Sequence, residues 1–71
     1  MKILNREYGI EETIVESGRV AYSPFYKKGY TKNYLDSEGN KSDKTLYESL
    51  IDAEYGVKNS YHNLLKSFNN I

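Results

Sequence analysis

The stretch VAYSPFYKKGYTKNYL, from Val20 to Leu35, decides the fold of this chain. It holds four tyrosines at a spacing of four residues, a pattern that fits a helix and a strand equally well. Pro24 and Gly29 decide between the two, because inside a helix they cost about 3 and about 1 kcal/mol. The stretch therefore predicts a β-hairpin.

The turn of this hairpin predicts which side chains share a face of the sheet. Lys27-Lys28-Gly29 is typical of a three-residue loop that ends with glycine in the left-handed region. Such a loop pairs Tyr26 with Tyr30. Continuing the ladder then pairs Tyr22 with Tyr34, so all four rings are expected on one face.

A second hairpin is predicted just before this stretch. The β-branched run within Ile10 to Glu16 indicates a strand, and Ser17-Gly18 indicates a two-residue turn. The expected cross-strand pairs are Glu16 with Arg19, Val15 with Val20, and Ile14 with Ala21. The result is a three-stranded antiparallel β-meander from about Ile10 to Leu35.

Alternation along the meander sorts its apolar side chains onto two faces, and both faces are too apolar for solvent. One face is expected to carry Val15, Val20, Tyr22, Tyr26, Tyr30 and Tyr34, and the other Ile10, Ile14, Ala21, Phe25 and Leu35. One helix can cover one face, and which one stays open. The other face needs a second layer: residues 1–9, which form a short strand or a helical turn that ends at Gly9, a second copy, or another partner.

One long helix is predicted from about Thr45 to Phe68, packed on the sheet in an α+β fold. Thr45 to Glu48 forms a capping box. The apolar stripe that follows consists of Leu46, Leu50, Ala53, Val57, Tyr61, Leu64 and Phe68, widened by Ile51 and Leu65. Gly56 indicates a kink or a close approach to the sheet. An alternative makes Lys41 to Tyr47 a fourth, edge strand and begins the helix at Ser49.

Length and composition predict the class of protein. The 71 residues indicate one small domain, 1–71, whose core supplies about 3 to 5 kcal/mol and leaves room for a homo-oligomer. Acids and bases balance at ten each, so there is no global field to recruit nucleic acid or a membrane. Without cysteine, signal-peptide pattern or spanning segment, we expect a cytoplasmic protein in contact with no membrane.

The order of motifs resembles small phage and mobile-element proteins. These motifs are Y-x-P-x-Y-K-K-G-Y from Tyr22, Y-L-D-S-E-G from Tyr34 and S-L-I-D-A-E from Ser49. The resemblance implies a β-meander-plus-helix fold and a phage-like origin, although this chain lacks the tryptophans of many such proteins. Frequent Lys, Asn, Ile and Tyr also indicate AT-rich coding DNA.

No catalytic or metal-binding constellation is predicted. His62 is the one histidine, and its helix position indicates a partly exposed surface residue. Asp36 to Asn40 has a passing likeness to a calcium loop, but glycine stands at the fourth place instead of the sixth, which favours a plain turn. We therefore expect no cofactor, no metal and no enzymatic activity.

The remaining candidate site is a surface of tyrosines and bases around the central hairpin. Its residues are Arg19, Tyr22, Tyr26, Lys27, Lys28, Tyr30, Lys32 and Tyr34. Tyrosine and arginine concentrate binding energy at protein interfaces, so these residues predict a protein-binding surface. The resemblance to phage and mobile-element proteins and the AT-rich composition imply the target: a host protein that the chain binds and blocks as an anti-defence inhibitor. Two alternatives stay open. The rings form the core beneath the helix, with their hydroxyls reaching water at the rim, or the surface binds single-stranded nucleic acid, with bases stacked on the rings and lysines on the phosphates.

Overall fold

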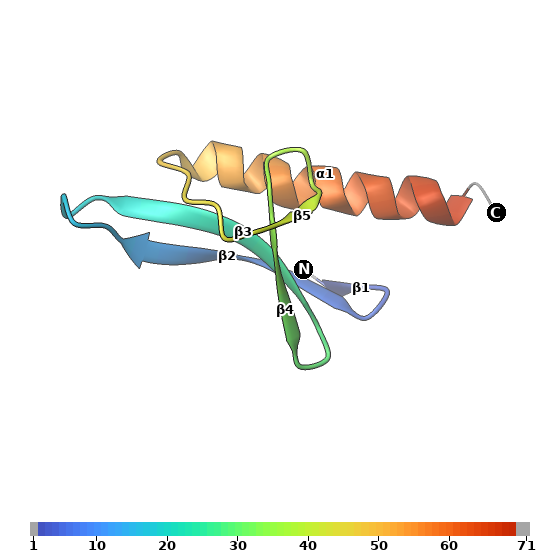
Figure 1. The fold of residues 1–71 in the computed structure, drawn as a ribbon. Helices are drawn as coiled ribbons and strands as arrows, with labels where there is room; N and C mark the ends of the chain where they lie inside the picture. The colour runs from blue at the N-terminus through green and yellow to red at the C-terminus, as the bar shows by residue number, and fades with distance from the viewer. Residues whose placement is uncertain (1, 70–71) are drawn as a thin grey trace.

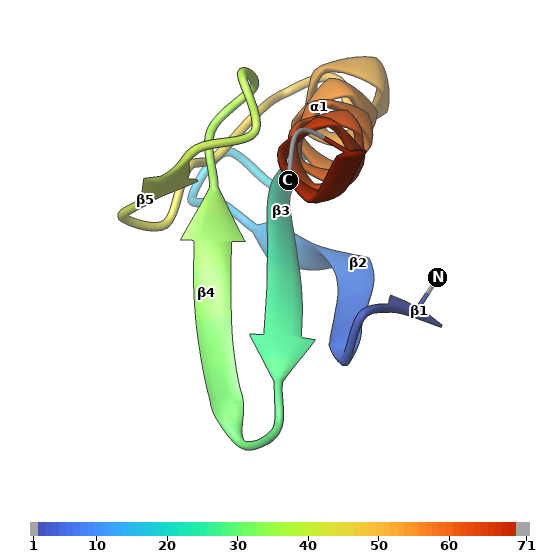
Figure 2. The same ribbon diagram turned by 90° about the vertical axis from the view of Figure 1, so that its right-hand side faces the viewer.

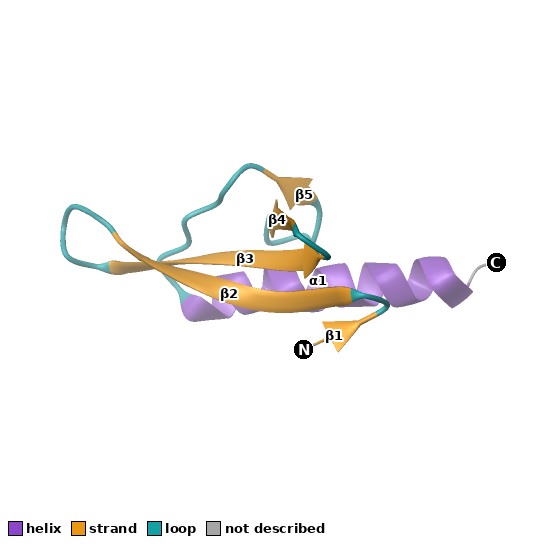
Figure 3. Cartoon of the chain, turned by 90° about the horizontal axis from the view of Figure 1, so that it is seen from below, coloured by secondary structure: helices purple, strands orange, loops and turns teal. Residues whose placement is uncertain are grey.

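The computed structural model describes residues 2–69 and shows one antiparallel sheet packed by one helix (Figure 1). The elements are β1 (Lys2–Ile3), β2 (Arg6–Ile14), β3 (Val20–Lys28), β4 (Thr31–Leu35), β5 (Lys41–Ser42) and α1 (Leu50–Asn69). The strands lie in the order β1-β2-β3-β4-β5, and α1 runs along the long β2–β3 hairpin (Figure 3). The predicted α+β architecture is confirmed. Within residues 2–69, the helix is too polar to cross a membrane.

Strand β2 begins at Arg6, so the prediction that Gly9 ends the first segment is wrong. Leu4 and Asn5 both have positive φ, at 46° and 67°, which is the type I′ geometry that joins β1 to β2. Gly9 is tolerated inside the strand because the Phe25 ring covers it: a Cβ there would come 2.8 Å from Phe25 Cζ.

The β2–β3 hairpin has a three-residue loop in place of the predicted two-residue turn. Gly18 has a φ of 85°, its N–H donates to the Val15 carbonyl at 2.8 Å, and Val15 N–H donates to the Arg19 carbonyl at 2.9 Å. Ile14 therefore pairs with Val20, and the predicted pairs are each displaced by one residue.

The β3–β4 hairpin shows the opposite change, with a two-residue turn in place of the predicted three-residue loop. Lys28 pairs with Thr31, and Gly29 alone of the two turn residues has positive φ, as in a type II′ turn. Tyr26 consequently pairs with Asn33, and Phe25 pairs with Tyr34. The observed pairing is displaced by three residues from the predicted one. A displacement by an odd number of residues moves side chains to the opposite face, so the prediction that four tyrosines share a face is wrong.

Pro24 interrupts the ladder between β3 and β4 and thereby recruits the segment before the helix. The neighbouring Tyr22 exchanges backbone hydrogen bonds with Tyr47, at 2.7 and 2.9 Å, so this edge of β3 faces away from β2. Pro24 has no N–H to offer the Leu35 carbonyl on that edge. That carbonyl instead accepts a 2.8 Å hydrogen bond from the Thr45 hydroxyl.

The core lies between α1 and one face of the sheet. It contains Tyr8, Tyr26 and Leu35, with Val57 of α1 packed against them. The rings of Tyr8 and Tyr26 lie 5.7 Å apart, and the Arg6 guanidinium stacks 4.3 Å from the Tyr26 ring centre. The helix therefore covers the face of Tyr26 and Leu35, which the predicted register had placed on opposite faces.

Helix α1 begins at Leu50 instead of Thr45, because Thr45 is engaged with β4. The Ser49 hydroxyl accepts a hydrogen bond from Ile51 N–H at 3.2 Å, which confirms the alternative start. The alternative edge strand is present as β5, although it is much shorter than expected.

Small residues fill the buried stripe of α1; of the predicted stripe, only Ala53 is buried, and Val57 is packed against the core. Ala53, Gly56 and Ser60 are buried against the sheet and the loop before β5. Five large apolar side chains stay exposed on or before the helix: Leu46, Leu50, Ile51, Tyr55 and Phe68. Small residues bring the helix backbone close to the sheet, which leaves its flanks uncovered.

The turn from Asp36 to Asn40 docks onto α1. The Asp36 carboxylate accepts from the backbone N–H of Glu38 and Asn40, at 3.0 and 2.9 Å, which makes an ordinary Asx turn. Asn59 of α1 donates to the Ser37 carbonyl at 2.8 Å. The predicted turn is confirmed, and its side-chain oxygen is occupied by backbone donors.

Candidate functional site

The turn between β3 and β4 forms a basic end of the molecule. Tyr30 occupies the second turn position and is fully exposed, and Lys27 and Lys28 before it are exposed as well. Lys32 follows it on β4, directly opposite Lys27. We call these four residues the hairpin end. It projects away from α1, at the far end of the molecule (Figure 2).

Three other sequence-predicted site residues do not join this surface. Arg19 lies in the β2–β3 loop, where its guanidinium is 3.9 Å from the Glu48 carboxylate. Tyr22 is half-buried beside Tyr47, and Tyr26 is 4% exposed within the core. The predicted continuous patch is therefore divided among a loop, the core and the hairpin end.

The sheet face opposite α1 continues the hairpin end with two aromatic rings. Phe25 and Tyr34 pair across β3 and β4 and are both half-buried. The Lys32 ammonium lies 4.4 Å from the Phe25 ring centre and 5.2 Å from that of Tyr34. The aromatic and cationic groups thus alternate along this face, from the turn toward the middle of the sheet.

Glu11 neutralises the inner part of this face. Its carboxylate forms ion pairs with Lys32 and, at 2.6 Å, with Lys44, and it accepts the Tyr34 hydroxyl at 3.2 Å. Hydrogen bonds from Lys32 and Lys44 lower the pKa of Glu11 to about 2, and the Glu11 carboxylate in turn raises the pKa of Lys32. Lys27 and Lys28 are left as the bases nearest Tyr30.

Sequence reasoning missed Phe25 and Lys44 as members of this face. Phe25 joins this face through the observed pairing of Lys28 with Thr31, which puts residues 25, 27, 32 and 34 on one face by alternation; the predicted register had placed it on the face opposite the tyrosines. Lys44 was not recoverable, because its approach to Glu11 depends on how the segment before α1 folds back over the sheet.

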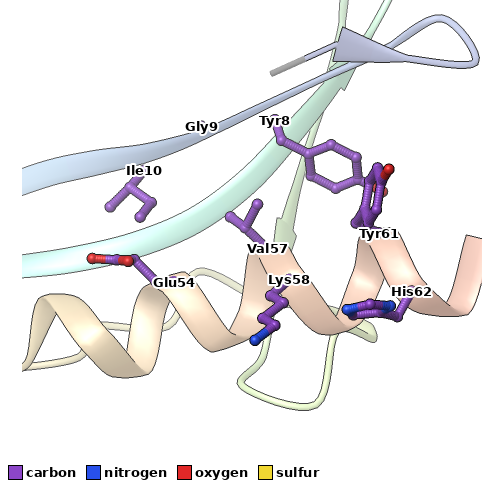
Figure 4. Close-up of a pocket in the computed structure, with 8 residues that line it drawn as sticks. All are labelled: Tyr8, Gly9, Ile10, Glu54, Val57, Lys58, Tyr61 and His62. Carbon is purple, nitrogen blue, oxygen red and sulfur yellow. The ribbon is translucent and has the colours of Figure 1, made fainter.

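A second surface feature, also missed, is a groove between β2 and α1 (Figure 4). It has a volume of about 540 Å³ and a mostly apolar lining. Tyr8, Gly9, Ile10, Glu54, Val57, Lys58, Tyr61 and His62 line it. The sequence signal for this groove was the apolar i, i+4 pair Val57 and Tyr61, which was assigned to the core.

Histidine and acidic side chains form no cluster in the described part of the chain. His62 is exposed on α1, with its ring edge-on to Tyr61 at 5.8 Å, and it belongs to the rim of the groove. Between residues 2 and 69, no three histidine or acidic side chains come together as a metal site would require. The sequence-based expectation that the chain is not an enzyme stays a prediction.

Comparison with known proteins identifies no relative of this chain. No family model, curated protein or solved structure matches the chain.

Proposed function

We propose that this chain is a non-catalytic phage or mobile-element accessory protein that binds and blocks a host protein in the host cytoplasm. One observation carries the proposal: a fully exposed tyrosine, Tyr30, stands among lysines at the projecting end of a hairpin. A protein of this kind acts as an anti-defence inhibitor by occupying a surface of its target.

The exposed ring has no evident part in folding. The type II′ turn requires glycine at position 29 and accepts any residue at position 30, so a small polar residue would serve the hairpin as well. A tyrosine offers a large contact area and a hydroxyl at little cost in side-chain entropy. Its exposure at this position therefore supports a role in contact with a partner.

The charges around Tyr30 indicate the chemistry of that partner. Lys27 lies opposite Lys32, a like-charge cross-strand pair that weakens a hairpin unless neighbours compensate. On the neighbouring strand β2, Glu7 pairs with Lys27 and offsets part of the repulsion between the two lysines. An acidic protein surface would offset more, so we propose that the target presents carboxylates around an aromatic-sized recess.

The host and phage parts of the proposal rest on other grounds. They come from the AT-rich composition and from the resemblance to small phage and mobile-element proteins. The fold is compatible with them, because a small domain that projects an exposed hairpin end can act by occupying a partner's surface.

Affinity capture from a low-GC bacterial lysate tests the proposal. We expect the tagged chain to retain one host protein after nuclease treatment, and Tyr30→Ala to lose it. Tyr55→Ala is the matched control, because Tyr55 is a half-exposed tyrosine on α1 at a distance from the turn. Equal capture by the parent and Tyr30→Ala would refute the assignment of the hairpin end.

Single-stranded nucleic-acid binding is the second candidate. The observation that favours it is the same exposed ring beside lysines, on which a base can stack while lysines hold phosphates. Salt separates the candidates, because phosphate contacts weaken steeply with ionic strength and a tyrosine-centred protein interface changes little. Recovery of nucleic acid alone, released at moderate salt, would favour this candidate over the protein target.

A further inference from the structure

The outer edge of β2 is open over most of its length. Within residues 2–69, β1 covers this edge at Arg6 and Glu7 and no other strand pairs with it. The Val15 N–H points toward β3, where it bonds to Arg19. By alternation, the backbone groups of residues 8, 10, 12 and 14 point outward, available to another strand.

Apolar surface accompanies this open edge. On the helix side, Tyr8 and Ile10 form the floor of the groove against α1 (Figure 4). Further along the same side, Ile14 is 76% exposed, because the β2–β3 loop extends beyond the start of α1 (Figure 1). A free backbone edge beside an uncovered apolar groove is the geometry at which a strand adds to a sheet.

We propose that a second copy of this chain occupies the edge, through antiparallel pairing of β2 with the partner's β2 about a two-fold axis at Glu11. The length of the open edge determines this register. A centre nearer the N-terminus would drive the partner strand into β1, whereas a centre at Glu11 pairs Tyr8 with the partner's Ile14 and uses the whole edge.

In this register the groove matches the side chains that it receives. The partner's Ile14 stands beside Tyr8, at the apolar end of the groove near Tyr61 (Figure 4). The partner's Glu12 stands beside Ile10, where Lys58 on the groove rim supplies the opposite charge, with Glu54 one turn before it. By symmetry each contact is made twice.

The axis position brings the two Glu11 side chains together on the other face of the sheet. Each carboxylate is already held by Lys32 and Lys44 of its own chain. Four ammonium groups therefore surround two carboxylates, and the like-charge pair is neutralised within the proposed dimer.

The helices leave room for this arrangement. Helix α1 packs mainly on β3, so three strand spacings of about 4.8 Å separate the two helices by about 14 Å. Packed helices lie about 8 to 10 Å apart, so the extra space accommodates the side chains that line the groove. The free chain has a solvent-accessible surface of 5125 Å², whereas about 4600 Å² is typical of a compact monomer of 8.3 kDa. The monomer therefore exposes more surface than its size requires, and a dimer would bury part of it.

Disulfide cross-linking tests the register, since the chain has no cysteine of its own. Residues opposite each other at the axis have Cα atoms about 4.5 Å apart, within reach of a disulfide. We expect Glu11→Cys to form a covalent dimer under mild oxidation. Glu12→Cys is the matched control, because its two copies would lie beyond the about 7 Å that a disulfide spans.

Sedimentation equilibrium of the full chain tests the dimer without cysteine. We expect a monomer–dimer equilibrium that Ile14→Lys weakens at least about 100-fold, because each dimer loses two buried isoleucines. Leu46→Lys, which also replaces an exposed apolar side chain with lysine but lies beyond the other edge of β3, should leave the equilibrium unchanged.

Three results would overturn the proposal. They are a parent chain that stays monomeric at every concentration, a dimer that Ile14→Lys and Leu46→Lys weaken equally, and faster cross-linking through position 12 than through position 11. None of these results affects capture of a host protein through Tyr30, which lies in the β3–β4 turn and is not part of the open edge of β2.

Discussion

Gly56 of α1 lies directly against Pro24 of β3. A Cβ on Gly56 would come 2.8 Å from Pro24 Cγ and 2.7 Å from the Asp36 carbonyl oxygen. The sequence left open whether this glycine marks a kink or a close approach, and the contact establishes the close approach. It is the point at which helix, sheet and turn meet.

We predict that Gly56→Ala destabilises the protein although alanine is the better helix former. The helix gains about 1 kcal/mol, but the methyl group overlaps a backbone oxygen that cannot move without displacing the turn, so the net loss should be about 1 to 3 kcal/mol. Urea unfolding measures it, with Lys66→Ala on the exposed last turn as a control. A more stable Gly56→Ala variant would mean that the helix stands further from Pro24.

The two buried serines should respond oppositely to the same substitution. Ser60 is 3% exposed and its hydroxyl bonds to the Tyr8 hydroxyl at 2.9 Å, so Ser60→Ala should cost about 1 to 2 kcal/mol. Ser23 is 0% exposed and its hydroxyl has no partner among the described residues, so Ser23→Ala should be neutral or stabilising by up to about 1 kcal/mol. Thermal unfolding of both variants measures the two changes in stability. Equal losses of stability would contradict the description of Ser60 as hydrogen-bonded and of Ser23 as unpaired.

Acid should remove the contribution of Glu11 to stability. Its folded pKa of about 2 lies below its ordinary value of 4.5, so the contribution is complete above pH 4.5 and is lost as the pH falls toward 2. Glu11→Gln should therefore be less stable than the parent at neutral pH but lose less stability over this interval. The exposed neighbour Glu12→Gln serves as control, and parallel acid limbs for all three proteins would refute the ion-pair description.

Truncation of two tyrosines in the same hairpin should have very different effects. Tyr26→Ala empties the core beside Tyr8 and should cost about 3 to 5 kcal/mol, whereas Tyr30→Ala should stay within about 0.5 kcal/mol of the parent. Chemical denaturation of the two variants checks this. Similar losses would place Tyr30 in a packed environment and remove the basis of the hairpin end.

Much of the fold was predictable from local pattern. The meander, the single helix and the turn at residues 36–40 follow from Pro24, the glycines and the apolar spacing. The start of the helix was not, because Thr45 and Ser49 both begin capping sequences. The Leu35 carbonyl, deprived of a donor by Pro24, engages Thr45, and this tertiary contact decides between them.

The register of β3–β4 was the consequential error, and it has a physical cause. Gly29 suits the last position of a three-residue loop and the first position of a type II′ turn equally well. The observed register puts Leu35, which is fully buried, on the same face as Tyr26 and beneath α1. Burial under the helix thus selects the turn, and the turn alone does not predict it.

The candidate site was predictable in part for the same reason. Lys27, Lys28, Tyr30 and Lys32 are sequence neighbours and stay together in either register. The predicted positions of Tyr22 and Tyr26 in the site depended on the register. In the structure Tyr26 is buried in the core and Tyr22 is half-buried beside Tyr47. The open edge of β2 and its groove were not predictable. They result from the position of α1 over the sheet, which is set by a narrow stripe of small residues on the helix.

Nuclear Overhauser contacts between Hα protons of β3 and β4 test the central claim most directly, namely that the observed register separates the tyrosines and leaves Tyr30 at a free turn. Non-hydrogen-bonded antiparallel pairs bring Hα protons into close contact. We predict strong Hα–Hα contacts between Phe25 and Tyr34 and between Lys27 and Lys32. Absence of both, with a strong contact instead between Phe25 and Thr31, as a ladder that pairs Tyr26 with Tyr30 requires, would contradict the register and the site built on it.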